Sequence, residues 1–388
     1  MTFRGLTWDH PRGRAPLEAA AARANAGRRD PLITWDTQPL EGFENVPLAE
    51  LAECYDLIVF DHPHIGEAVV DGCLQPLEDF YSPAQIAEWN HQTMGPALAS
   101  YSFGGRTWGL PIDIAMQVVA RRADLLPDAP MSWDETEDIA QDLPVALSLA
   151  GPHAVLTLFS LLASEGIEPS GRYLLPDIQA CAALERMERL YRIAPKGSET
   201  LNPIALLELM ARTKEIALIP LIFGYVTYAS PLSDMRAISF SDTPRAVTGY
   251  GGVLGGAGLG ITRRCEPNKA LLDHLAELVS PQLQTRLFPD AGGQPAARAA
   301  WQDDAVNKSS GGFYRDTLMT AEHSFIRPRF DGYIAFQTRA SEAIRVGFEA
   351  RRPADAILKT LQSHWAQARK NARGDLDDRE TRHDRKSA

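Results

Sequence analysis

Three short segments of this chain combine carboxylates, imidazoles and indoles, which are the side chains best suited to hold a polar ligand. Carboxylates accept hydrogen bonds from hydroxyl groups, and aromatic rings stack on the C–H faces of a polyhydroxylated molecule. Each segment directly follows a stretch with strand character, so we expect the three to converge at one edge of a sheet. They read Trp8-Asp9-His10, Trp35-Asp36 and Asp61-His62-Pro63-His64.

The same residues have other possible roles. The donor types of a metal site are present in His62, His64 and Asp61, with His10 as a further candidate. Histidines in such loops more often donate hydrogen bonds or are solvated, so we predict no metal and no cofactor. A tryptophan at a strand end either stacks on a ligand or plugs the end of the sheet. We favour the ligand for Trp8 and leave both roles open for Trp35.

The elements that position these segments alternate between strand and helix from residue 3 to residue 61. The last of the strands is almost wholly apolar, which is typical of a parallel strand covered by helices on both faces. The β-α-β-α-β order therefore predicts an open α/β sheet. The expected strands are Phe3 to Trp8, Leu32 to Trp35 and Asp56 to Phe60, and the expected helices are Leu17 to Ala26, opened by Pro16, and Leu48 to Cys54.

The stretch from Trp108 to Leu126 (WGLPIDIAMQVVARRADLL) predicts an unusually long strand over residues 112–120. Its β-branched residues favour a strand, and Pro111 bars a helix. A strand that leaves one domain and enters another has this form, although a plain central strand has it too. Asp113 has no obvious partner in the sequence, and a ligand hydroxyl is a plausible one.

The rest of the chain continues the mixture of helix and strand. Phe223 and Tyr225, at the end of a predicted buried strand, suit either a core or a ligand-lining role. Residues 289–315 are predicted to be turn-rich, and the charged tail after Lys370 to be disordered. The expected strands are Ala146 to Leu149 and Ile216 to Phe223. One helix is expected to start at Ser132 and Asp134, and the other expected helices are 82–100, 153–164, 175–191, 202–212, 268–279, 333–344 and 353–368.

The glycine-rich stretch Tyr250 to Gly260 (YGGVLGGAGLG) fits no dinucleotide-binding register. We expect its glycines to let two backbones, or a backbone and a ligand, approach closely. The chain also lacks the GxSxG, HExxH, Walker A and EF-hand motifs. No residue stands in a recognisable catalytic setting, so we predict no enzyme.

Composition and charge argue against further classes of partner and against a membrane-spanning protein. The 388 residues suggest two domains, and the net charge of −11 with scattered Lys and Arg argues against nucleic-acid and anionic-membrane partners. No apolar run is long enough to span a bilayer. The first residues show no signal peptide, so the chain is either cytoplasmic or has lost one. Cys54, Cys73, Cys181 and Cys265 fit free thiols as well as one or two disulfides.

The 108–126 stretch resembles the hinge of type-1 extracellular solute-binding proteins, a Y-G-L-P-x-D pattern followed by a strand and R-x-D-L-L. Three further segments resemble the same family in the same order. They are Ala205 to Ala229, VLGGAGLGI at 253–261, and R-P-A-D-A-I-L at 352–358. The likeness spans about residues 3 to 370, and its nearest general type is the maltose- or glycerophosphodiester-binding component of ABC importers. The missing signal peptide or lipobox cysteine is a departure from the family.

The resemblance implies a periplasmic-binding-protein-like fold of type II, with two discontinuous lobes that close over a ligand about hinge crossings. One lobe would comprise 1–112 and about 254–328, and the other 113–253 and about 329–370. Trp8, Asp9, His10, Asp36, Asp61, His62 and His64 would line one wall of the cleft. Asp113 would lie at the hinge, Gly255 and Gly256 at the second crossing, Phe223 and Tyr225 on the other lobe, and Arg327, Arg329 and Tyr333 at a possible third crossing.

The implied function is a monomeric substrate-binding protein of an ABC importer, working with permease subunits in the periplasm. The residue types suit a sugar, a polyol or a related organic acid. Arg12, Arg327 and Arg329 leave a carboxylate- or phosphate-bearing ligand possible. The alternative is a cytoplasmic enzyme or ligand sensor on the same scaffold.

Overall fold

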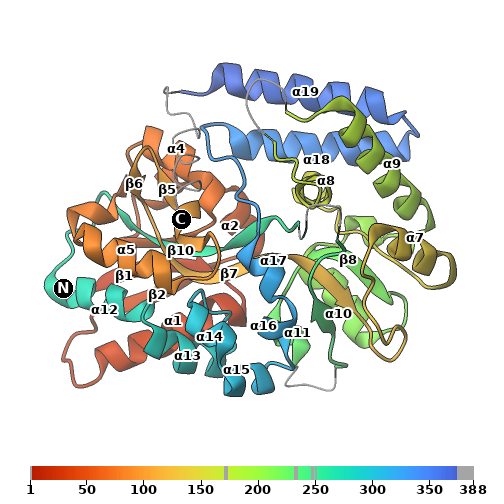
Figure 1. Ribbon diagram of the computed structural model, residues 1–388. Helices are drawn as coiled ribbons and strands as arrows, with labels where there is room; N and C mark the ends of the chain where they lie inside the picture. Colours follow the sequence, from red (N-terminus) through yellow and green to blue (C-terminus); the bar gives the residue numbers. More distant parts are fainter. Residues whose placement is uncertain (1, 170–173, 231–234, 246–248, 250, 374–388) are drawn as a thin grey trace.

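The computed structural model describes residues 2–169, 174–230, 235–245, 249 and 251–373. Its central feature is a mixed sheet in the strand order β2-β1-β3-β10-β7-β8 (Figure 1). We expect the tail after Lys370 to be disordered, and its residues from 374 onward lie outside the described ranges. The six strands are β1 (Phe3–Trp8), β2 (Ile33–Gln38), β3 (Leu57–Phe60), β7 (Leu110–Arg121), β8 (Leu218–Phe223) and β10 (Leu254–Thr262).

The N-terminal part of the sheet is parallel, as the β-α-β pattern predicts. β1 pairs in parallel with both β2 and β3, and all four residues of β3 are buried. β10 then runs antiparallel to β3 and β7. Four short strands complete the pairing: β4 (Leu74–Gln75) on β10, β9 (Ser239–Ser241) on β7, and the separate pair β5 (Ser102–Phe103) and β6 (Arg106–Thr107).

The long strand predicted over residues 112–120 is confirmed as β7, which spans twelve residues. Its first half pairs with β10, and its second half pairs with β8 and β9. Ile112 packs with the core around β1 and β3, whereas Val118 packs with the core around β8. Pro111, which has no amide hydrogen to donate, lies beside the register shift between Ala257 and Gly258, where regular pairing is interrupted. One strand therefore contributes to two separate cores.

Helices on both faces enclose these cores. Around β1 and β3, the apolar faces of three helices bury Leu17, Leu275 and Leu283. These helices are α1 (Pro11–Asn25), α12 (Lys269–Leu278) and α13 (Pro281–Asp290). A smaller core involves α3 (Leu48–Leu51), α4 (Ile65–Val70) and β5. Nearby lie α2 (Leu40–Asn45), α5 (Pro83–Gln92), α6 (Ala97–Ser100) and the 3-10 helices η1 (His62–His64) and η2 (Leu77–Asp79).

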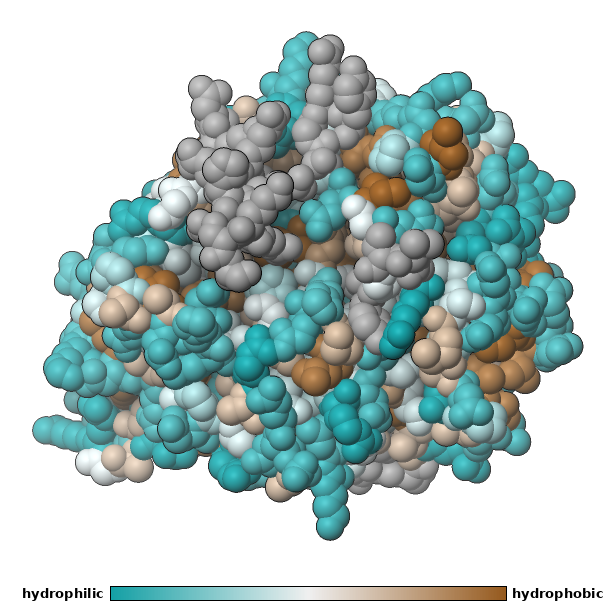
Figure 2. Space-filling model, viewed as in Figure 1, coloured by the Kyte–Doolittle hydropathy of each residue, from teal (hydrophilic) through white to brown (hydrophobic). Residues whose placement is uncertain are grey.

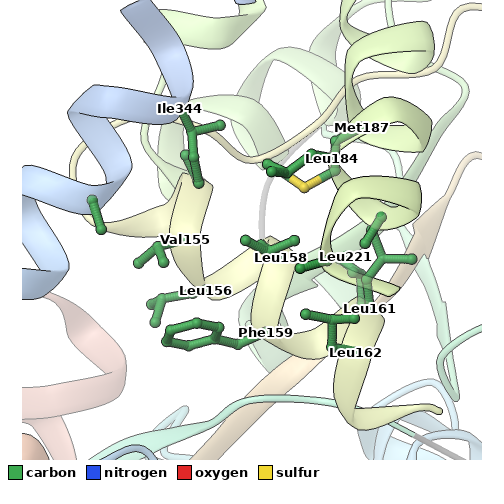
Figure 3. Close-up of a cluster of buried hydrophobic side chains, with 14 of the residues drawn as sticks. Val155, Leu156, Leu158, Phe159, Leu161, Leu162, Leu184, Met187, Leu221 and Ile344 are labelled. Atoms are coloured by element: carbon green, nitrogen blue, oxygen red, sulfur yellow. The ribbon is translucent and has the colours of Figure 1, made fainter. Parts of the chain in front are cut away.

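A helical layer covers the other end of the molecule (Figure 1). α8 (His153–Ala163) is buried along almost its whole length between α9 (Asp177–Ile193) and α18 (Tyr333–Glu349). Figure 3 shows Leu158 of α8 packed among Leu184, Met187 and Ile344. α19 (Ala354–Asn371) lies over α9 and α18, and Trp365 anchors it. α7 (Trp133–Asp142) and η3 (Ser198–Thr200) are also in this part of the chain.

The core around β8, to which Val118 belongs, lies between α10 (Pro203–Arg212), β8 and several short helices. These short helices are α11 (Val226–Ala229), α14 (Arg298–Gln302), α15 (Asp304–Ser309), α16 (Phe313–Asp316) and α17 (Leu318–Glu322). Trp301, Phe313 and Tyr314 supply its large buried side chains. The face of the molecule seen in Figure 2 is mostly hydrophilic with separate small apolar patches. Among the described residues, no helix has the length and apolarity to cross a membrane.

Several expected elements differ from the structure. Ala146 to Leu149 forms no strand, because only the single bridge Val145–Leu218 connects that segment to the sheet. The region 289–315, predicted to be turn-rich, contains α14 to α16, and the helix α13 was not expected. α1 begins at Pro11, five residues before the predicted opening at Pro16, because the His10 side chain caps it.

Candidate functional site

The ends of β1 and β8 meet through two aromatic rings. His10 follows β1 and its ring contacts the ring of Tyr225, which follows β8, at 5.2 Å between centroids in an edge-on arrangement. The His10 Nδ1 accepts a hydrogen bond of 3.1 Å from the backbone amide of Arg12 and caps α1. Burial and the nearby Arg12 lower the pKa of His10 to about 4. At neutral pH His10 is therefore an uncharged ring whose Nε2 carries the proton.

Directly beside this contact, Arg12 and Asp113 form a buried ion pair. The Arg12 Nε donates to the Asp113 Oδ2 at 2.7 Å, and the Arg12 Nη2 bonds the Oδ1. Both side chains are 4% exposed. The Arg12 Nη1 donates to the carbonyl oxygen of Gly224 at 3.2 Å, and the guanidinium lies 4.6 Å from the centre of the Tyr225 ring. Asp113 thus has the partner that the sequence did not reveal.

The electrostatics of this pair oppose its burial. Burial lowers the pKa of Arg12, but the neighbouring Asp113 carboxylate outweighs it and leaves that pKa above its ordinary value. Burial raises the pKa of Asp113, although Arg12 favours its ionised form. A pair held in this bidentate geometry is rigid, because both carboxylate oxygens and two of the guanidinium nitrogens are bound.

Gln294 completes this part of the site, and sequence reasoning missed it. Its Nε2 donates to the carbonyl oxygens of Ile114 at 2.7 Å and of Gly224 at 3.3 Å, while its Oε1 accepts from the Val226 amide at 3.0 Å. The side chain is fully buried. One glutamine therefore fixes the segment after β8 against β7. A glutamine in a turn-rich stretch gives no sequence signal for such a role.

A second group of polar residues gathers where β3 ends. Asp61 pairs with Arg327, with 2.5 Å between the Asp61 Oδ2 and the Arg327 Nη2. Arg327 also donates from Nε to the carbonyl oxygen of Leu254 at 3.1 Å. The His62 Nδ1 lies 3.2 Å from the other Asp61 oxygen. Residues 266 positions apart in the chain are thus joined at the start of β10.

Burial and charge set the protonation states in this group. Burial raises the pKa of Asp61, but Arg327 and His62 outweigh it, and the pKa lies well below the ordinary value. Burial and the nearby Arg327 lower the pKa of His62 to about 4. Asp61 is therefore ionised and His62 neutral at pH 7.

His153, which sequence reasoning did not include, joins the site from α8. Its ring lies edge-on to Phe223 at 5.7 Å, and burial together with Arg327 lowers its pKa to about 3. Phe223 in turn covers Gly255, where a Cβ atom would lie 2.6 Å from the phenyl ring. At Gly256 a Cβ atom would lie 2.4 Å from the Asp113 carbonyl oxygen, and φ is +109°. These glycines let β10 approach β7 and the Phe223 ring closely, as expected.

We refer to Arg12, Asp113, His10, Gly224 and Tyr225 as the β7 cluster. We refer to Asp61, His62, Arg327, His153 and Phe223 as the β3 cluster. The two are electrostatically connected, because Asp61 acts on the pKa of Asp113. Gly255 and Gly256 lie between the two clusters, and seven other residues predicted to line a ligand belong to the clusters themselves. They are His10, Asp61, His62, Asp113, Phe223, Tyr225 and Arg327.

The other predicted residues lie elsewhere. Trp8 is 4% exposed, packs 5.1 Å from the Phe43 ring and covers Gly13, so it plugs the end of the sheet. The exposed side chain of Asp9 pairs with Arg14 at 2.7 Å.

Asp36 is likewise exposed and pairs with Arg4 at 2.7 Å on the edge strand β2. His64 is buried in η1 at the start of α4. Arg329 donates to the carbonyl oxygens of Ala99, Ser100 and Ser102 and holds the chain against α6.

Within the part of the chain that the structure describes, no three His, Cys, Asp or Glu side chains are placed to hold a metal ion. All four cysteines are free thiols, and burial raises the pKa of Cys73 to about 11 and of Cys265 to about 12. A pocket of about 530 Å³ between α14 and α17 shares no residue with the two clusters.

Comparison with known proteins identifies the architecture. Residues 48–202 match the sequence profile of a family described as bacterial extracellular solute-binding protein. The chain has the solute-binding protein fold. The hinge-like stretch 108–126 lies inside the matched residues, and the expected type II fold and the resemblance to this family are both confirmed.

Solved structures with the solute-binding protein fold match almost the whole chain. The maltose-bound MalE3 of T. maritima has a TM-score of 0.79 at 17% identity, with 95% of this chain and 99% of that chain covered. A solute-binding protein from Agrobacterium radiobacter K84 in complex with ribitol has the same TM-score and identity, with 95% and 98% covered.

The GacH receptor of Streptomyces glaucescens has a TM-score of 0.77 at 12% identity, with 95% and 98% covered. No curated protein matches the sequence.

Proposed function

We propose that this chain is the substrate-binding component of an ABC importer and holds a small polar solute between two lobes. The solute would be a sugar, a polyol or a related organic acid. The observation that supports this most is the meeting of the β1 and β8 ends, through His10 and Tyr225, where β7 passes from one core to another. Ligands of α/β proteins bind at the carboxyl ends of strands, beside such crossings.

We further propose the lobes implied by the resemblance, 1–112 with about 254–328 and 113–253 with about 329–370. In this proposal the rings of His10, Phe223 and Tyr225 contact the ligand, and the bare backbone at Gly255 and Gly256 lies beneath it. Asp113 and Arg327 act from within their ion pairs. The protein works as a monomer outside the cytoplasm and delivers its ligand to permease subunits, without making or breaking a bond in it.

A thermal-shift screen of sugars, polyols and sugar acids tests this function. A ligand that binds only the folded chain stabilises it by about 2.7 kcal/mol at one hundred times its dissociation constant. We expect a shift of several degrees with members of one of these classes and with no nucleotide or amino acid. Turnover of the bound compound, detected by mass spectrometry after incubation, would contradict the proposal. So would the absence of any shift.

Binding of the same compound by a Phe223→Ala variant provides the site control. Phe223 is partly exposed and contacts His153 and Gly255, so its removal should weaken binding while the fold remains. Trp8→Phe, at the buried plug of the sheet, is the matched aromatic control and should leave the ligand affinity unchanged. Equal affinities for all three chains would place the ligand elsewhere.

A further inference from the structure

We propose that the site selects uncharged ligands, because the opposite charges within each of its two ion pairs neutralise each other. Among the described residues of the two clusters, no charged side chain is then left to meet the ligand. This inference deepens the proposed function and rests on it. The residue types alone leave organic acids and phosphates possible, since three arginines lie in the relevant segments. The structure shows where the hydrogen-bonding capacity of each arginine goes.

The Arg12 side chain is 4% exposed, and each of its three guanidinium nitrogens already donates a hydrogen bond. Two of its nitrogens bind the Asp113 carboxylate, and its third binds the carbonyl oxygen of Gly224. Tyr225 covers the plane of the guanidinium at 4.6 Å. Because the fork of donors is rigid, an anion could gain this arginine only by displacing Asp113.

Arg327 is committed in the same way. Its Nη2 binds Asp61, its Nε donates to the Leu254 carbonyl oxygen, and its Nη1 lies 3.4 Å from the Oε1 of Gln337. It is 3% exposed. The third candidate, Arg329, is 4% exposed and bound to three backbone carbonyls of the α6–β5 segment, where it has a structural role.

The imidazoles add no charge at neutral pH. The pKa values of His10 and His62 are about 4 and that of His153 is about 3, in each case lowered first by burial. The two clusters thus contain two guanidinium cations and two carboxylate anions, each joined to its opposite. A charged ligand would have to be buried beside them without a counter-ion, which is unfavourable in a desolvated site.

The same geometry predicts that removing one charge changes the preference. Asp113→Asn keeps the size of the side chain and one acceptor for Arg12 but leaves the guanidinium without its counter-charge. A carboxylate on the ligand can then supply that charge. Arg12→Gln combined with Asp113→Asn removes both charges and should restore the original preference.

The experiment compares matched ligands by calorimetry at pH 7. The probes are glucose, ribitol and maltose, their carboxylate counterparts glucuronate, ribonate and maltobionate, and the amine glucosamine. We expect the unmodified chain to bind at least one uncharged probe about tenfold or more tightly than its charged counterparts. In Asp113→Asn the affinity for the carboxylate relative to its uncharged counterpart should rise by about tenfold. In the double variant this ratio of affinities should return to the value of the unmodified chain.

Two further variants serve as an alternative test and as a control. Asp61→Asn removes the anion of the second pair and tests the same prediction should Asp113→Asn fail to fold. Asp36→Asn removes the anion of the exposed Arg4 pair and should leave every affinity ratio unchanged. Preferential binding of a charged probe by the unmodified chain would overturn this inference and leave the proposed function standing. Binding of none of the probes would contradict both.

Discussion

At the scale of single residues, the most informative feature is a set of imidazoles held in their uncharged form. His62 and His153 are buried beside Arg327, and their pKa values are lowered from 6.5 to about 4 and about 3. In the unfolded chain both histidines take up a proton as the pH falls below their ordinary pKa. The unfolded state then binds more protons than the folded state, so the free energy of unfolding decreases as the pH decreases.

This gives a prediction for stability against pH. Between about pH 6.5 and about pH 4, each of these histidines should reduce the free energy of unfolding by about 1.4 kcal/mol per unit, until the folded-state pKa is reached. Urea unfolding at a series of pH values measures this. His62→Gln should flatten the slope by one proton. An unchanged slope in His62→Gln would contradict the buried neutral state.

A second residue-scale prediction concerns Trp8. Its side chain is buried against Phe43 and Gly13. Trp8→Ala should therefore reduce the free energy of unfolding by about 3–5 kcal/mol, as large-to-small core substitutions do. Trp35→Ala, at a partly exposed indole on the same sheet, is the matched comparison and should be milder. Chemical denaturation of both variants measures the difference, and equal losses would contradict the plug role of Trp8.

Sequence reasoning could locate the residue types of the site but not their pairing. The strand-end rule named His10 and Asp61 as candidates, and their contact with a ligand stays a prediction. It could not show that Asp113 bonds Arg12, because nothing local marks a contact between residues 101 positions apart. It also grouped Trp8 and Asp36 with the site, since a strand end alone does not say whether a side chain faces the core, the solvent or a ligand.

At the scale of elements, β10 shows why a strand in this position needs glycine. Leu254 to Thr262 pairs with both β3 and β7, and its register shifts between Ala257 and Gly258. At Gly256 the backbone adopts φ of +109° and approaches the Asp113 carbonyl oxygen. Only glycine tolerates both the conformation and the proximity.

Gly256→Ala should accordingly be destabilising. The backbone strain alone is about 1–3 kcal/mol, and the added methyl would also push β10 away from β7. Gly27→Ala is the matched control, because φ is +73° there but a Cβ atom would meet nothing within 4 Å. The difference in free energy of unfolding between the two variants isolates the strand contact. A Gly256→Ala protein no less stable than Gly27→Ala would contradict the close approach.

The elements that could be predicted are those with a strong periodic pattern. α8, α9, α10, α12 and α19 were expected within three residues of their observed bounds, since their apolar faces repeat at the helical period. The failures have identifiable causes. α14 to α16 have four to six residues each, too short to display a period, and Ala146–Leu149 is apolar because it is buried, not because it is a strand.

At the scale of the whole molecule, β7 and β10 join regions that have separate hydrophobic cores. Ile112 and Leu259 belong to the core around β1, whereas Val118 and Leu254 belong to the core around β8. A bend of these two strands near Asp113 and Gly256 would move the cores relative to each other without breaking either. The Arg12 contacts to Asp113 and Gly224 cross this position, so they limit how far such a bend can go.

Because both strands belong to both cores, the two regions should unfold together. Leu17→Ala in α1 and Leu206→Ala in α10 each create a cavity at a residue no more than 1% exposed, one in the core around β1 and one in the core around β8, and should each destabilise the chain by about 2–5 kcal/mol. We expect both variants to lower the midpoint of one shared thermal transition, followed by far-ultraviolet circular dichroism and by tryptophan fluorescence. Separate transitions, each moved by one variant alone, would mean that the shared strands do not couple the cores. A bound ligand that contacts both regions should raise that single midpoint in either variant, since it stabilises the only folded state that the shared strands allow.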